Sequence, residues 1–150
     1  MVETSLPFRF GTTVLPLRNN LEVRCALLGL HHYNIAYFTC FPWSSRLYDI
    51  PGIRYVGEDM SSRLERKWRV APMVEQAREA DCKALACYRS GELVAKDGIP
   101  AEPLLLEFPN LLHIIVKYLF EGRVCFEDPS LKLGMPAPPG YAQAMERLSF

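Results

Sequence analysis

The chain has 150 residues, of which 49% are hydrophobic and 23% are charged. This balance is ordinary for a globular protein and excludes the polar, highly charged composition of disordered chains. Lys+Arg and Asp+Glu number 17 each, so no overall field draws the chain onto nucleic acid or an anionic membrane. Any such contact must be local.

The cysteines indicate a redox compartment, and the longest apolar stretch bears on whether the chain has a membrane segment. Five scattered cysteines fit a reducing compartment better than a disulfide scaffold. The longest apolar stretch, residues 104–120, is interrupted by Glu107, Pro109 and Lys117, so it falls short of the ~20 largely apolar residues of a spanning helix. We expect no membrane segment.

The first forty residues predict an extended arm, a helix and a strand. Prolines and a glycine interrupt residues 1–20, which favours an extended N-terminal arm. Residues 21–30 have apolar side chains at helical spacing after Asn20, a plausible N-cap, and predict a short helix. Residues 34–41 are rich in aromatic residues and stop at Pro42, which predicts a central strand.

The middle of the chain predicts a loop followed by a helix. Residues 42–60 hold prolines, glycines and small polar residues, which favour turns. Ser62 and Glu65 form a capping box and predict that a helix starts there. Pro72 suits a first helical turn, so we expect the helical region to about residue 80 to consist of two pieces joined near Ala71.

The last third predicts a hairpin, a helix and a second arm. Residues 82–88 and 92–96 flank a three-residue loop that ends in Gly91, which is typical of a β-hairpin. Residues 109–120 lie between Pro109 and Gly122, which predicts a largely buried helix. Four prolines in residues 123–150 predict an extended C-terminal arm with a short helix near its end. Together these elements predict an α+β fold.

No motif in the chain predicts catalysis or a bound cofactor. No Walker loop, dinucleotide fingerprint or nucleophile elbow is present. No Cys-x-x-Cys or His-x-x-x-His pair supplies the ligands of structural zinc, so we expect no metal site. Cys40 lacks a second thiol nearby to resolve a mixed disulfide, and we expect it to be a buried apolar residue.

One basic segment could contact RNA. Arginine presents paired donors to phosphate oxygens, and tryptophan offers a face on which a base can stack. The alternative interpretation is a solvated helix face, which is the usual meaning of a charge run. The candidate RNA-binding residues are Arg63, Arg66, Lys67 and Arg69, with Arg46 and Arg54 on the preceding loop and Trp68 for stacking.

Residues 26–43 contain three short stretches that resemble a known protein family. The stretch Ala26-Leu-Leu-Gly-Leu30, the following His31-His-Tyr-Asn and the segment Phe38-Thr-Cys-Phe-Pro-Trp43 resemble the family of the fifty-third protein of the mitochondrial large ribosomal subunit, which is thioredoxin-like. The similarity is closest over residues 28–43. It implies a thioredoxin-like domain over residues 21–122, with a small mixed sheet flanked by helices and an arm on each side.

The resemblance implies a noncatalytic structural component of the mitochondrial ribosome. Such a protein contacts neighbouring ribosomal proteins and, where its basic residues reach it, rRNA. It acts in translation without a small-molecule substrate, a cofactor or a membrane. The same fold class includes an accessory subunit of respiratory complex I, and fold analogy does not separate the two assemblies. A third hypothesis is a thiol oxidoreductase or redox sensor that uses Cys40.

Overall fold

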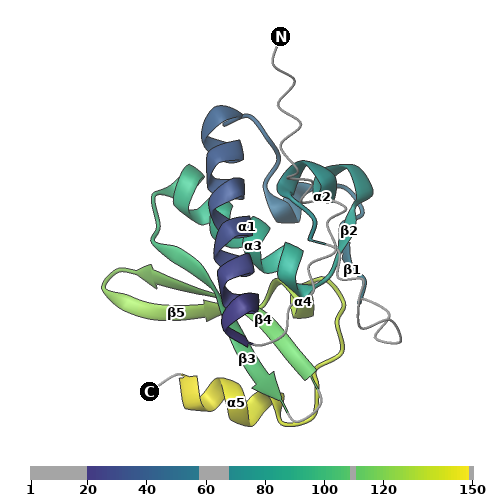
Figure 1. Cartoon of the computed structure of the whole chain (residues 1–150), viewed down its shortest axis with the longest axis vertical. Coiled ribbons are helices and arrows are strands. Elements are labelled where there is room, and N and C mark those ends of the chain that lie inside the picture. Colours follow the sequence, from purple (N-terminus) through teal and green to yellow (C-terminus); the bar gives the residue numbers. More distant parts are fainter. Residues whose placement is uncertain (1–19, 58–67, 109–110, 149–150) are drawn as a thin grey trace.

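The computed structural model describes residues 20–57, 68–108 and 111–148 (Figure 1). Helices and strands both contribute, and a small three-stranded sheet is flanked by helices, so the predicted α+β class is confirmed. Apart from Asn20, the predicted N-terminal arm lies outside the described residues.

Two long helices form one layer of the molecule. Helix α1 spans Asn20–Cys40, and its buried residues recur at helical spacing: Val23, Leu27, Leu30, His31, Asn34 and Phe38. Helix α3 spans Cys82–Asp97. It starts at Asp81, whose side chain accepts the backbone N–H of Ala84 at 3.1 Å, and it ends at Gly98, whose φ is +65°. The two helices pack against each other in front of the sheet (Figure 1).

The sheet is an antiparallel meander. Its strands are β3 (Ala101–Phe108), β4 (Leu111–Phe120) and β5 (Arg123–Glu127), in the order β3-β4-β5. The turn between β4 and β5 consists of Glu121 and Gly122, which have φ values of +51° and +74°. Two positive φ angles are typical of a two-residue type I′ turn, which matches the twist of the strands that it joins.

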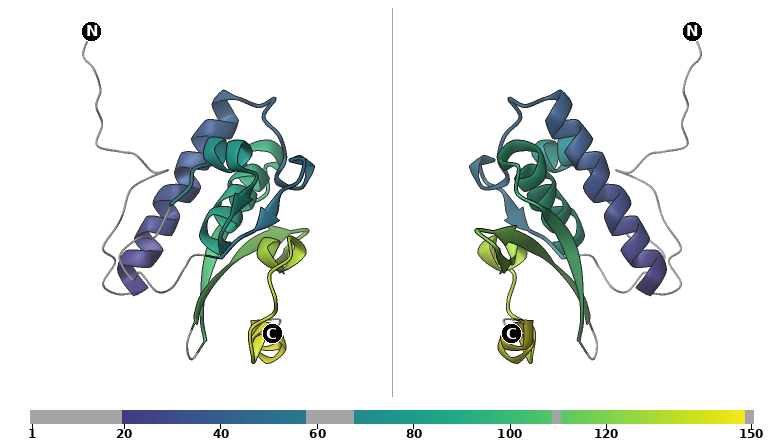
Figure 2. Two further views of the ribbon diagram at one scale, coloured as in Figure 1. Left: turned by 90° about the vertical axis from the view of Figure 1, so that its right-hand side faces the viewer. Right: turned by 90° about the vertical axis from the view of Figure 1, so that its left-hand side faces the viewer.

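Helices cover both faces of the sheet. One face contributes Leu105, Ile114 and Val116 to a core cluster shared with α1 and α3. Helices α4 (Pro129–Lys132) and α5 (Tyr141–Leu148) lie on the other side (Figure 2). There, His113 Nε2 lies 2.7 Å from Asp128 Oδ2, and the hydroxyl of Tyr141 donates to the same oxygen at 2.8 Å.

A second, smaller region surrounds the C-terminal half of α1. It comprises a 3₁₀ turn η1 (Leu47–Asp49), strands β1 (Arg54–Tyr55) and β2 (Glu79–Ala80), and helix α2 (Ala71–Ala77). The two strands pair in parallel. Pro72 stands in the first turn of α2, so the predicted second helical piece is confirmed, whereas the predicted start at Ser62 lies outside the described residues.

The strand predicted for residues 34–41 is wrong, because residues 34–40 complete helix α1. Asn34 and Phe38 are both buried at a spacing of four, which places them on one helix face toward α3. The short helix predicted for residues 21–30 is therefore the first half of a longer one. Tertiary packing overrides the β preference of the aromatic residues in this segment.

The hairpin predicted for residues 82–96 is also wrong, because the segment is α3. Gly91, assigned to a turn, lies inside the helix, where it permits close packing rather than a reversal of the chain. A Cβ atom added there would meet Asn34 Cβ of α1 at 2.8 Å. Its place in the fold is thus the crossing point of α1 and α3.

The helix predicted for residues 109–120 is strand β4. Ile114, Ile115 and Val116 are consecutive and all buried, because helices cover both faces of the sheet at this point. A central strand covered on both faces shows no polar alternation, so its apolar run cannot be told from a buried helix by periodicity alone. The predicted burial is confirmed for residues 113–116, whereas Leu119 and Phe120 at the end of the strand are exposed.

The order predicted for residues 21–122, which is helix, strand, helix, hairpin and helix, is therefore not the order of the described elements. The three-stranded sheet is antiparallel rather than mixed. The segment predicted as a C-terminal arm contains β5, α4 and α5, so much of it has regular structure; α5 is the short helix expected near the end. Among the described residues, no helix has both the length and the hydropathy needed to cross a bilayer.

Candidate docking surface

The C-terminal end of α1 presents two exposed aromatic side chains, Phe41 and Trp43, which we call the aromatic corner. Helix α1 ends at Cys40 because Pro42, two residues further on, cannot continue it. A tight turn follows, in which the backbone N–H and the hydroxyl of Ser44 both donate to the carbonyl of Phe41, at 3.0 and 2.7 Å. The Trp43 ring packs edge-on against Phe41, with 5.6 Å between centroids, and remains 78% exposed.

An arginine clamp holds the segment after the corner on helix α3. The guanidinium of Arg46 donates to both carboxylate oxygens of Asp97, at 2.9 and 2.6 Å. This bond to Arg46 lowers the pKa of the Asp97 carboxyl. Lys96, the preceding residue on α3, donates to the carbonyl of Ser44. Two neighbouring side chains at the end of α3 therefore fix the turn that carries Trp43.

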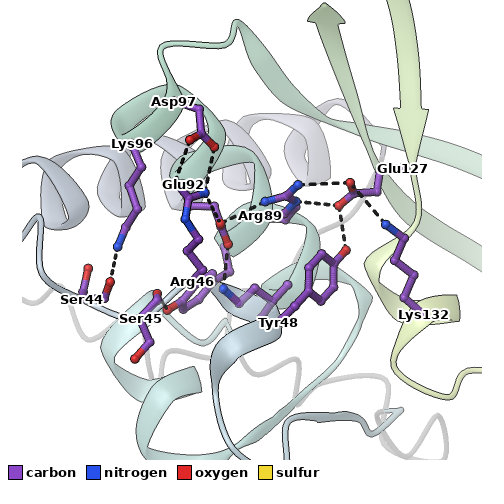
Figure 3. A network of polar contacts seen from close by, with 12 residues as sticks. Ser44, Ser45, Arg46, Tyr48, Arg89, Glu92, Lys96, Asp97, Glu127 and Lys132 are labelled. Carbon is purple, nitrogen blue, oxygen red and sulfur yellow. Dashed lines mark hydrogen bonds and ion pairs between the residues drawn. The ribbon is translucent and has the colours of Figure 1, made fainter.

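A buried carboxylate, Glu92 on α3, anchors the next residues (Figure 3). Its Oε1 accepts the backbone N–H of the buried Leu47 at 2.8 Å, and its Oε2 lies 3.0 Å from Arg89 and 3.4 Å from Arg46. Burial raises the pKa of Glu92, and the Leu47 hydrogen bond and the two arginines oppose that shift. A buried charge requires such partners, and here they tie η1 to α3.

The same network continues to strand β5 through Glu127. Its carboxylate accepts from Arg89 Nε at 2.7 Å and from the hydroxyl of Tyr48 at 2.7 Å, and it lies 3.5 Å from Lys132 Nζ (Figure 3). Burial raises the pKa of Glu127, but the hydrogen bonds from Arg89 and Tyr48 outweigh it, so the net pKa is lowered. The arginine thus bridges two carboxylates that lie on different elements.

A tyrosine pair joins the helix end to α2. The hydroxyl of Tyr88 donates to Glu75 at 3.0 Å and lies 2.6 Å from the carbonyl of Ser45, while Tyr37 donates to Glu75 at 3.1 Å. Burial is the main cause of the raised pKa of both phenols. Taken together, the polar network brings together segments that are distant in sequence and gives the corner a rigid base.

The five thiols differ in exposure: Cys25 and Cys40 are exposed, Cys82 and Cys125 are intermediate, and Cys87 is buried. Cys40 is exposed at the end of α1, so the prediction that it is buried is wrong. The reason is the change of element: on a helix the buried Phe38 turns Cys40 away from the core. Cys82 and Cys87 pack into the core, and burial raises the pKa of Cys82 to about 12 and that of Cys87 well above its ordinary value.

The predicted RNA-binding residues do not form one described patch. Arg63, Arg66 and Lys67 lie outside the described residues. Arg69 donates to the carbonyl of Glu79 at 2.6 Å, and Arg46 belongs to the clamp.

Arg54 and Trp68 complete the predicted set. Arg54 has a 70% exposed side chain and pairs with Glu79 at 3.0 Å. Trp68 is fully buried, with Lys83 Nζ at 5.3 Å from its ring centroid. The predicted stacking role of Trp68 is therefore contradicted by its burial, since neither ring face is open to a base.

Sequence reasoning missed both the corner and its base. The run Phe-Pro-Trp directly after a helix was a visible signal, since a tryptophan beside a helix-ending proline has no regular element in which to be buried. The network around Glu127 left no local pattern in the sequence, because Glu127 lies 38 positions from Arg89 and 79 positions from Tyr48. Within the described residues, no group of three or more His, Cys, Asp or Glu side chains is placed to hold a metal.

Comparison with known proteins adds no relative: no family model matches the chain, and neither the curated proteins nor the solved structures include a significant match.

Proposed function

We propose that this chain is a noncatalytic, partner-bound component of a larger protein assembly and that the aromatic corner is its main anchor. The observation that carries the proposal is the 78% exposure of Trp43 on a rigid turn. Tryptophan is the residue type most enriched among the side chains that dominate binding energy at protein interfaces. A protein partner that covers Trp43 and Phe41 would remove a large apolar area from water.

The rigid base of the corner supports this proposal. A flexible tryptophan loses conformational entropy when it binds, whereas one held in place loses little. Here the Arg46 clamp, the Lys96 bond to Ser44 and the Glu92 bond to Leu47 all restrain residues 44–47, which follow the corner. The turn therefore has a fixed conformation in the free chain, so binding would cost it little conformational entropy.

The internal pairing of the charged groups supports a structural rather than a catalytic role. Glu92, Asp97 and Glu127 each bind an arginine. A general base must be able to reach a substrate proton, and these carboxylates are directed at partners within the chain. The raised pKa of the buried thiols Cys82 and Cys87 keeps them protonated and therefore poorly nucleophilic.

The mitochondrial large ribosomal subunit is the assembly that we propose. The support is the resemblance described above for residues 28–43, a stretch that contains the last turns of α1 and the aromatic corner itself. In such a particle the chain would contact neighbouring ribosomal proteins through the corner, and Arg54, the most exposed described candidate, would be the residue to meet rRNA.

Affinity purification followed by mass spectrometry tests both parts of the proposal. Tagged wild-type chain should enrich mitochondrial ribosomal proteins, and Trp43→Ser should lose them while remaining folded. Leu21→Ser is the matched control, because Leu21 is 70% exposed at the opposite end of α1. A set of respiratory-complex proteins would overturn the ribosomal assignment alone. Partners retained by Trp43→Ser would overturn the role of the corner, and an empty set would overturn the whole proposal.

A redox role for Cys40 is a second candidate, favoured by the exposure of this thiol. It predicts that Cys40 becomes oxidised at lower peroxide concentrations than the other exposed thiol, Cys25, and that this oxidation alters partner binding. Mass spectrometry of the two cysteines during a peroxide titration measures the difference. Equal oxidation of both thiols would contradict the role.

A further inference from the structure

The two edge strands of the sheet differ in the backbone hydrogen-bond donors that they present to another strand. Strand β4 is central, so β3 and β5 each have one unpaired edge among the described elements. The N–H of Leu119 donates to the carbonyl of Pro100 at 2.9 Å, and bonded residues alternate along an antiparallel pair. The backbone groups of Pro103 therefore point outward from β3. Proline has no N–H, so this edge lacks a donor at its centre.

The outer edge of β5 has donors and acceptors. Val124 lies opposite Leu119, whose N–H points to the other neighbour, so the N–H and C=O of Val124 point away from β4. The same alternation directs the backbone of Phe126 outward. In the described part of the chain, no backbone hydrogen bond outside the sheet involves either residue. Figure 1 shows β5 at the margin of the sheet, with its hairpin projecting from the body.

Apolar side chains accompany this open edge. Val124 and Leu119 form a cross-strand pair and are 55% and 44% exposed. Both also line a groove of about 390 Å³ between the hairpin, α1 and the end of α3. An exposed apolar edge strand without proline is an unusual liability for a protein that stays alone.

The residues of β5 are complementary to themselves when the strand is reversed. The order Arg123, Val124, Cys125, Phe126, Glu127 has a base and an acid at its ends, two apolar residues inside and a cysteine at its centre. Antiparallel pairing about Cys125 sets Arg123 opposite Glu127, and Val124 opposite Phe126, of a second copy. Like charges never face each other in this register.

We propose that β5 pairs antiparallel with β5 of a second copy about a two-fold axis at Cys125, which joins two three-stranded sheets into one of six strands. Val124 and Phe126 then exchange both of their backbone bonds with Phe126 and Val124 of the other copy. Because Glu127 already binds Arg89 and Tyr48, its contact with Arg123 mainly preserves charge balance at the rim. This self-association uses a surface separate from the aromatic corner and does not depend on the proposed function.

Light scattering of the purified full chain over a dilution series tests the proposal. The wild type should pass from dimer to monomer on dilution. Val124→Thr, which keeps the β preference and every backbone group, should behave like it. Val124→Pro removes an outward N–H without breaking a bond to β4, and Val124→Lys places a charge on the exposed edge. Each should raise the dissociation constant by about tenfold or more.

Monomeric wild type at every concentration would overturn the proposal, as would a Val124→Lys variant that stays folded by circular dichroism and dimerises as strongly as the wild type. Val124→Lys keeps the test decisive if Val124→Pro fails to fold, since the side chain of Val124 is half-exposed.

Disulfide trapping tests the register. Cys125 should face its own copy at a non-hydrogen-bonded position, where Cα atoms are about 4.5 Å apart, within the range that a disulfide spans. Copper phenanthroline should therefore link two copies of a chain in which the exposed Cys25 and Cys40 are replaced by serine. The further change Cys125→Ser should abolish the product. Absence of a linked dimer at a concentration where light scattering shows a dimer would overturn this register.

Discussion

Gly91 and Asn34 show how single residues set the packing of α1 on α3. The Asn34 side chain is buried and accepts the backbone N–H of Ala71 at 2.9 Å, so it also fixes the start of α2. Gly91 faces it from α3 without a Cβ atom, which brings the helices close together. The sequence alone does not reveal the role of Gly91, because a glycine in a turn and a glycine at a helix–helix contact cannot be told apart until the partner helix is known.

Gly91→Ala should destabilise the protein by about 1–3 kcal/mol, since the added methyl group meets Asn34 Cβ and the nearby backbone of α1. Gly29→Ala is the matched control, because Gly29 is also helical and a Cβ there meets nothing within 4 Å. That variant should gain about 0.5–1 kcal/mol from helix propensity. Urea unfolding measures both changes. Equal effects of the two substitutions would show that the close approach does not limit the packing.

His31 gives the fold a dependence on pH. It is buried and shares a hydrogen bond of 2.7 Å with Ser90 on α3, and burial, followed by the charge of His32, lowers its pKa to about 4. Between pH 6.5 and 4 the unfolded chain binds a proton at this site that the folded chain does not. The free energy of unfolding therefore falls as the pH falls through this window, by up to about 3 kcal/mol.

His31→Gln should flatten this part of the stability profile, and His32→Gln, a change at an exposed neighbour, should leave most of the slope in place. Urea unfolding at a series of pH values from 7 to 4 provides the comparison. A slope that His31→Gln leaves unchanged would assign the pH dependence to other groups.

At the scale of elements, the start of α2 was predictable from local chemistry, whereas the caps of α3 at Asp81 and Gly98 were missed and the strands depend on tertiary contacts. Pro72 placed the start of α2 correctly, because the first helical turn requires no N–H from it. The type of β4 was missed, since Pro109 and Gly122 satisfy the rules for helix ends as well as for turns. Only the pairing of β4 with strands on both sides reveals it as the central strand.

The clamp between Arg46 and Asp97 couples the turn after α1 to the end of α3. Arg46→Ala and Asp97→Ala should each cost about 1 kcal/mol, because the pair is partly exposed, and the double variant should cost less than their sum by about 0.5–1 kcal/mol. Urea unfolding of the four proteins in this cycle measures the coupling.

Hydrogen exchange supplies the local test of the same clamp. In either variant, the amides of Asp49 and Ile50, which bond to the carbonyls of Arg46 and Leu47, should exchange faster than in the wild type. Strictly additive stabilities together with unchanged exchange would show that the clamp does not restrain the turn.

For the molecule as a whole, the expected mixture of helices and strands predicted the α+β class although several elements were misassigned, and hydrophobicity predicted that residues 113–116 are buried. They did not predict the network from Ser44 to Lys132, because a charged residue that pairs across 38 positions, as Arg89 does with Glu127, has no local pattern. The aromatic corner depends on this network, because the network holds the turn on which Trp43 is exposed.

Sedimentation of the native chain in a lysate tests the central claim most directly. A free chain of 17.1 kDa would remain near the top of a sucrose gradient, and a β5-paired dimer would move only slightly further. We predict that most of the tagged protein, expressed at a low level, sediments with large particles and that Trp43→Ser returns it to the top. Wild-type protein found only in the lightest fractions would contradict the account.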